Sequence, residues 1–137
     1  MPRHNPRITV VNDNPGFLDM MHALLEEGSG YDVTTIDGDK IHDVEPIRES
    51  RPELMIIDLR WREGGLAGWD VLQAVRQDAE LRELPIILCT GDLRGLEERA
   101  EAIAEDLYLA TLPKPFQVAE LEDLVRRFVG EAVPSNR

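Results

Sequence analysis

The apolar residues of this 137-residue chain fall into two patterns that alternate along its length. In the first pattern, short runs of consecutive apolar and β-branched residues predict strands that are buried on both faces. These runs occupy residues 7–11, 31–36, 53–57, 84–89 and 109–112. We therefore expect five short strands, each followed by a segment of a different pattern.

The second pattern is a helical repeat of apolar residues between the strands. It covers residues 17–25, where Gly28 is a natural stop, a weak short segment at 43–50, and three further segments at 69–77, 96–107 and 118–128. The segment 96–107 places Leu96, Ile103 and Leu107 on one face and predicts a single amphipathic helix.

The order of these segments is a strand followed by a helix, repeated five times. Strands without apolar–polar alternation suit a parallel sheet covered by helices on both faces, and right-handed crossovers make this a doubly wound α/β sandwich. We expect one domain at 7–129, with an N-terminal tail at 1–6 and a C-terminal tail at 130–137.

Composition and charge narrow the classes of protein. Apolar residues make up 42% of the chain, so disorder is not expected. The chain shows no membrane-spanning apolar run, no secretory signal and only one cysteine, Cys89, which together predict a cytoplasmic protein. A formal charge of −12 disfavours nucleic acid and anionic membranes as direct partners and favours cations and basic surfaces.

Polar residues follow four of the predicted strands. They are Asn12 and Asp13, then Asp58, Thr90 and Lys114. In a doubly wound sheet these side chains meet beyond the carboxyl ends of the strands, where ligands bind. Asp13 and Asp58 suit a hard cation such as Mg²⁺. Thr90 would donate a hydrogen bond to a phosphoryl oxygen, and Lys114 would neutralise its charge.

This set of residues resembles the receiver domain of two-component response regulators over about residues 8–129. The resemblance implies the flavodoxin-like receiver architecture. It implies a non-enzymatic switch in which Asp58 accepts a phosphoryl group, with Thr90 and Lys114 sensing it. Mg²⁺ would be held by Asp13, Asp58 and the carbonyl of Arg60, with Asn12 as a weak or water-mediated ligand.

The same resemblance implies a set of partners. They are a sensor histidine kinase or phosphotransfer protein, or a small phosphodonor, and a downstream protein target. It leaves room for a homodimer through the last helix–strand–helix face. A cis bond between Lys114 and Pro115 is also typical of the family, and an X–Pro bond is where a cis peptide costs least.

Three features depart from the family pattern. Asn12 replaces the first acid of the usual pair, which removes a negative charge from the metal site. The loop after Asp58, "LRWREGGLAG", is about two residues longer than usual and lacks proline. Thr111 stands where a switch aromatic is usual. No effector domain follows Val129, so we expect a stand-alone receiver.

Other interpretations stay open at this point. A degenerate receiver that binds partners without phosphorylation fits the three departures. A dehalogenase-type enzyme would need a second acid at Arg60, and no loop resembles the phosphate-binding run of a flavin module. Single residues also have interpretations that need no phosphoryl chemistry. Asp13 would then be a helix N-cap and Thr90 a turn residue. Trp61 would fold over its own loop or anchor a partner.

Overall fold

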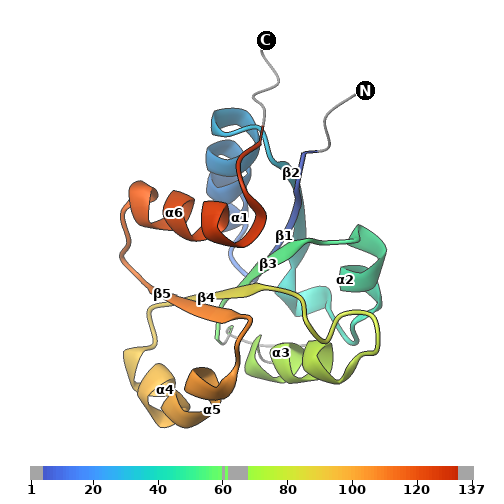
Figure 1. The fold of residues 1–137 in the computed structure, drawn as a ribbon, viewed down its shortest axis with the longest axis vertical. Coiled ribbons are helices and arrows are strands. Elements are labelled where there is room, and N and C mark those ends of the chain that lie inside the picture. The colour runs from blue at the N-terminus through green and yellow to red at the C-terminus, as the bar shows by residue number, and fades with distance from the viewer. Residues whose placement is uncertain (1–4, 60, 62–67, 133–137) are drawn as a thin grey trace.

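The computed structural model describes residues 5–59, 61 and 68–132 and has a five-stranded parallel sheet at its centre (Figure 1). The strands are β1 (Arg7–Asn12), β2 (Asp32–Asp37), β3 (Leu54–Ile57), β4 (Ile86–Thr90) and β5 (Leu109–Pro113). Their order across the sheet is β2-β1-β3-β4-β5, and every neighbouring pair is parallel. The doubly wound α/β fold predicted from the sequence is confirmed.

The helical segments divide between the two faces of the sheet. In chain order they are α1 (Pro15–His22), η1 (Ala23–Gly28), η2 (Gly38–Lys40), α2 (Glu45–Ser50), α3 (Gly68–Gln77), α4 (Leu93–Glu98), α5 (Ala100–Glu105) and α6 (Val118–Val129). Figure 1 shows α1 and α6 on one face and α2, α3, α4 and α5 on the other. No helix among the described residues is long and apolar enough to cross a membrane.

Neighbouring residues of one strand enter different cores because successive side chains point to opposite faces. Val10 joins the core under α1 and α6 with Met21 and Leu121, whereas Val11 joins the core under α2 and α3 with Leu72. All of these side chains are buried. This is why the strands show continuous apolar runs rather than alternation.

The structure corrects the prediction of one amphipathic helix over 96–107. Two short helices, α4 and α5, occupy this region, and the chain departs from helical geometry at Arg99, with φ −112° and ψ 16°. Leu107 lies beyond α5 and is 87% exposed. The apolar repeat in the sequence therefore extends beyond the helix, because Leu107 fits the helical spacing but lies in the turn before β5.

The strand order reverses its direction at the centre of the sheet. From β1 the chain moves outward to β2, and from there it returns to β3 on the other side of β1. The connections after β1 and β3 therefore leave in opposite directions. Ligands of doubly wound sheets bind at this point, beyond the carboxyl ends of the strands.

Candidate functional site

The residues singled out at the strand ends lie at one edge of the sheet. Asn12 is the last residue of β1 and Asp13 follows it, Asp58 follows β3, Thr90 ends β4, and Lys114 follows β5. The strand register aligns these ends, since Val11 pairs with Ile57 and Thr90 with Pro113. Arg60, predicted to offer a carbonyl oxygen, lies outside the described residues.

An ion pair at this edge joins Lys114 to Asp58. The Lys114 ammonium donates a hydrogen bond to Oδ2 of Asp58 at 2.9 Å. The Asp58 side chain is 14% exposed and that of Lys114 is 29% exposed, so solvent screens the pair only partly. The backbone N–H of Lys114 donates to the Thr90 carbonyl at 2.8 Å, and the Lys114–Pro115 peptide bond is cis.

An aromatic ring also contacts the Lys114 ammonium. Nζ lies 4.3 Å from the centroid of the Phe17 ring, within the range of a cation–π interaction. Phe17 belongs to the first turn of α1, which follows β1 directly. The cation therefore touches groups from two elements, the end of β3 and the start of α1.

The turn between β1 and α1 is held by two asparagines. Oδ1 of Asn12 accepts the N–H of Asn14 at 2.9 Å, and Oδ1 of Asn14 accepts the N–H of Phe17 at 3.0 Å. Asn14, followed by Pro15 at the first helical position, is thus the N-cap of α1, and the interpretation of Asp13 as the N-cap is wrong. Asn12 is 2% exposed, and its Nδ2 has no hydrogen-bond partner among the described residues.

The oxygen donors at this edge fit a hard divalent cation. Asp13 and Asp58 follow β1 and β3, which are hydrogen-bonded neighbours, and their carboxylates are the ligand type that Mg²⁺ prefers. Asn12 Oδ1 already accepts a backbone N–H, whereas its Nδ2 is a donor that cannot coordinate a cation. Within the described part of the chain, no group of three or more His, Cys, Asp or Glu side chains is placed to hold a metal.

Thr90 is buried and takes part in a turn at the start of α4. Its Oγ1 accepts the N–H of Asp92 at 3.1 Å, and Oδ1 of Asp92 accepts the N–H of Gly95 at 2.9 Å as the cap of α4. The Thr90 hydroxyl proton remains available for a second acceptor, because this bond uses only an oxygen lone pair. Among the described residues, apart from its chain neighbours, a Cβ at Gly91 would first meet Cβ of Lys114 at 3.9 Å, so space remains beside the hydroxyl.

Gly68 is a structural requirement of the site that the sequence analysis missed. It is the first residue of α3, and a Cβ there would lie 1.7 Å from the carbonyl oxygen of Asp58. The N–H of Trp69 donates to the Leu59 carbonyl at 2.9 Å. The start of α3 therefore packs directly on the backbone of Asp58, and the glycine in "LAGW" was the signal for this close approach.

Trp61 is buried rather than presented to a partner. It is 9% exposed and packs in the core under α2 and α3. A Cβ at Gly38, in η2, would come within 3.0 Å of the indole ring. The exposed-anchor interpretation of Trp61 is wrong, and the ring lies against the segment after β2. Most of the loop that contains Trp61 lies outside the described residues, so the interpretation that the ring folds over this loop stays a prediction.

Cys89 lies in β4 next to the site, and its thiol is not activated for nucleophilic or redox chemistry. It is buried, and burial raises the pKa of its thiol to about 11 because the apolar surroundings disfavour the thiolate. A nucleophilic or redox role requires the thiolate. The cysteine is therefore a core residue.

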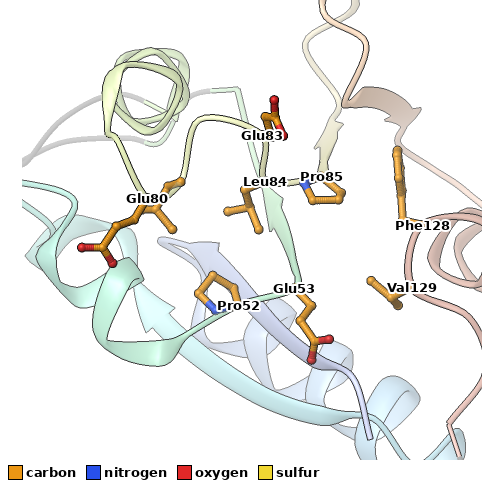
Figure 2. A pocket seen from close by; sticks show the side chains of 9 residues that line it. Pro52, Glu53, Glu80, Glu83, Leu84, Pro85, Phe128 and Val129 are labelled. Atoms are coloured by element: carbon orange, nitrogen blue, oxygen red, sulfur yellow. The ribbon is translucent and has the colours of Figure 1, made fainter. Parts of the chain in front are cut away.

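A separate hollow of about 530 Å³ lies at the other end of the sheet (Figure 2). Pro52 and Glu53 before β3, Leu84 and Pro85 before β4, and Phe128 at the end of α6 line it. None of the predicted site residues that the structure describes lines this hollow. The candidate site therefore stays at the carboxyl edge, where the charged and hydroxyl side chains meet.

Comparison with known proteins identifies the family of the chain. The response regulator receiver domain family matches residues 8–126. The polar-differentiation response regulator DivK of Brucella anthropi is 29% identical over 127 residues, covering 91% of this chain and 97% of that protein. DivK of Brucella ovis is 28% identical with the same coverage.

Solved structures of similar fold include two receivers. One is the receiver domain of the sensor histidine kinase PA1611 from Pseudomonas aeruginosa PAO1, which has a magnesium ion coordinated in its active site cleft. It is 29% identical to this chain, with a TM-score of 0.76, and the match covers 93% of this chain and 100% of that one. The Vibrio cholerae chemotaxis protein CheY4 is 21% identical, covers 92% and 100%, and shares the fold with a TM-score of 0.76. With a family match over most of its length, the chain belongs to the response regulator receiver domains.

Proposed function

We propose that this receiver is a phosphoacceptor switch in which Asp58 is the acceptor. The observation that carries the proposal is the 2.9 Å contact between Lys114 and Asp58 at the edge that also holds Asp13 and Thr90. A lone acid at a strand end would explain one residue. A carboxylate, an ammonium and a buried hydroxyl brought together from three separate strands support a common chemical task.

The proposed reaction is transfer of a phosphoryl group from a phosphohistidine or a small phosphodonor. A carboxylate oxygen of Asp58 attacks phosphorus, and the bond from phosphorus to the donor atom breaks with its electron pair leaving on the donor. The product is an aspartyl phosphate, later hydrolysed by water. Lys114 sits where it can offset the negative charge that gathers on the phosphoryl oxygens.

The proposed cofactor is Mg²⁺, held by Asp13, Asp58 and the carbonyl of Arg60, with Asn12 contributing weakly or through water. When bound, the ion would offset charge on the transferring phosphoryl group. The PA1611 receiver holds magnesium in its cleft, which supports the same use here. With Asn12 in place of an acid, the chain offers less negative charge to the ion than a three-carboxylate site would.

The proposed response passes from the phosphoryl group to β5 through Lys114 and to α4 through Thr90. Thr111, half-buried on β5, cannot act as a rotating aromatic, so the response differs in detail from the family pattern. Two exposed apolar residues follow the carboxyl ends of neighbouring strands: Leu93 begins α4 after β4, and Val118 begins α6 after β5. They support a protein partner near the site, either a downstream target or a second copy of the chain.

The alternative function is a receiver that binds partners without phosphorylation. The observation that favours it is Asn12, whose oxygen is occupied by Asn14 and whose nitrogen cannot bind a cation. A metal site without that third charge would work slowly at low Mg²⁺. The two functions share a fold and differ in whether Asp58 is ever modified.

Mass spectrometry of the intact protein after incubation with Mg²⁺ and acetyl phosphate tests the choice. We expect a mass increase of one phosphoryl group, located on Asp58 and absent from Asp58→Asn. Asp32→Asn, an exposed acid at the start of β2, is the matched control and should label like the parent. No labelling of the parent at saturating Mg²⁺, with small donors or with a phosphorylated histidine donor, would favour the interaction module.

A further inference from the structure

We propose that Phe17 positions the Lys114 ammonium over Asp58 and holds it while the cation changes partner during phosphorylation. Phe17 would be a positioning residue, since it acts through Lys114 and does not touch the reacting atoms. This inference rests on the proposed function of Asp58. It assigns to the first turn of α1 a task that its sequence alone did not reveal.

The geometry gives the ammonium two contacts of different kinds. It donates to Asp58 Oδ2 at 2.9 Å and lies 4.3 Å from the Phe17 ring centroid. A lysine side chain has four rotatable bonds and loses considerable freedom when its end is fixed. A second contact that restricts the ammonium to the site therefore reduces the fraction of time in which it extends into water.

The ring itself is held in place by its helix. The N–H of Phe17 donates to Oδ1 of Asn14 at 3.0 Å, which closes the first turn of α1. The side chain is half-buried and packs against the core under α1 and α6, next to the buried Leu18. The ring can thus act as a fixed surface against which the longer lysine moves.

The exchange of partner explains why an aromatic face is useful here. When Asp58 becomes an acyl phosphate, the negative charge moves outward from the carboxylate to the phosphoryl oxygens. The ammonium must then leave Oδ2 and bind a phosphoryl oxygen. A cation–π contact has no fixed donor–acceptor direction, so it can persist through this shift, whereas a competing carboxylate would hold the cation back.

The contact can be measured without phosphorylation. The chain has only two lysines, Lys40 and Lys114, so their ε-methylene signals are easily separated by NMR. A nearby ring face should shift the Lys114 signal upfield, while that of the exposed Lys40 stays at its ordinary position. Phe17→Leu keeps an apolar side chain and should remove the shift, and Phe17→Trp should retain it. An unshifted Lys114 signal in the parent would overturn the contact.

A double-mutant cycle on the initial rate of Asp58 phosphorylation tests the role. We expect Phe17→Leu to slow phosphorylation about two- to fivefold, the ratio that corresponds to one exposed cation–π contact. Phe17→Trp, which keeps an aromatic face, should be phosphorylated at the parent rate. In a Lys114→Ala background, Phe17→Leu should have no further effect, because the cation that the ring contacts is gone.

Two results would contradict this role separately from the function of the site. Equal slowing by Phe17→Leu with and without Lys114 would mean that the ring only supports α1. An unchanged rate in Phe17→Leu, with the circular dichroism of the parent, would mean that the contact has no part in the transfer. If the parent is never phosphorylated, the proposed function itself fails, and the positioning role fails with it even where the NMR shift is present.

Discussion

The ammonium of Lys114 lies 2.9 Å from the carboxylate of Asp58, although the two residues are 56 positions apart in the chain. The contact exists because β3 and β5 flank β4 and end at the same edge of the sheet. The turn after β5 adds to it, since the Lys114 N–H is tied to the Thr90 carbonyl. A change in charge on Asp58 therefore alters the electrostatic interaction with Lys114, the residue that follows β5.

Lys114→Ala should separate phosphorylation from its structural response. Asp58 keeps its nucleophilic oxygen, so acetyl phosphate at saturating Mg²⁺ should still label it, though more slowly. The link to β5 is lost because no cation remains to follow the phosphoryl group. Two-dimensional NMR of β5 and α6 with and without the phosphodonor measures this response. Lys40→Ala is the control, and full shifts on α6 in Lys114→Ala would rule out the sensing role.

Gly68→Ala should distort the acceptor rather than the core. Its Cβ would fall 1.7 Å from the Asp58 carbonyl oxygen, a distance that backbone atoms cannot tolerate, so α3 and the end of β3 must move apart. We expect a loss of about 1–3 kcal/mol in the free energy of unfolding, measured with urea, and a large loss in the rate of Asp58 phosphorylation. Ala74→Gly, within α3, is the control: it lowers helix stability by about 1 kcal/mol and leaves the rate unchanged.

The fold and the strand-end residues could be predicted because both depend on local pattern. Continuous apolar runs identify strands buried on both faces, and parallel strands bring their carboxyl ends to one edge. Asp58, Thr90 and Lys114 follow from that rule alone. The number of strands and their alternation with helices then determine the layers, whatever the details of each loop.

What the sequence did not reveal depends on contacts between distant segments. Phe17 fits the apolar face of α1, and nothing in its spacing indicates that its ring contacts Lys114. The position of Trp61 depends on Gly38, whose lack of a side chain makes room for the indole. The break at Arg99 likewise interrupts an apolar repeat that continues in the sequence.

Cys89 should react slowly with alkylating agents in the folded protein. Burial raises the pKa of its thiol from 9.0 to about 11, so at pH 8 the thiolate fraction is about a hundredfold below that of an ordinary cysteine. The pKa of Cys89 is higher in the folded state than in the unfolded state. The contribution of this thiol to the free energy of unfolding is therefore fully present below pH 9 and declines as the pH rises toward 11. Iodoacetamide labelling with and without urea measures the difference. Rapid labelling without urea would contradict a buried, neutral thiol.

Asn12→Asp should strengthen Mg²⁺ binding. Asn12 is 2% exposed, its Oδ1 accepts the Asn14 N–H, and its Nδ2 finds no hydrogen-bond partner in the part of the chain that the structure describes. Aspartate keeps an oxygen for that N–H and replaces the unpaired donor by a second oxygen that carries negative charge. In a site that is partly screened by water we expect a gain of roughly 1–2 kcal/mol, or about five- to thirtyfold in metal affinity.

The fluorescence of Trp61 and Trp69, both close to Asp58 in sequence, reports the titration of Mg²⁺ into parent and variant. Asn14→Asp is the matched control, because it adds the same charge at the exposed N-cap of α1 and keeps the cap oxygen. It should gain much less affinity.

In chelator the Asn12→Asp variant should be less stable than the parent, because a third carboxylate then repels Asp13 and Asp58. Equal Mg²⁺ affinity in Asn12→Asp and the parent would mean that residue 12 does not face the cation, and Asn12 would then have no part in weakening the proposed metal site.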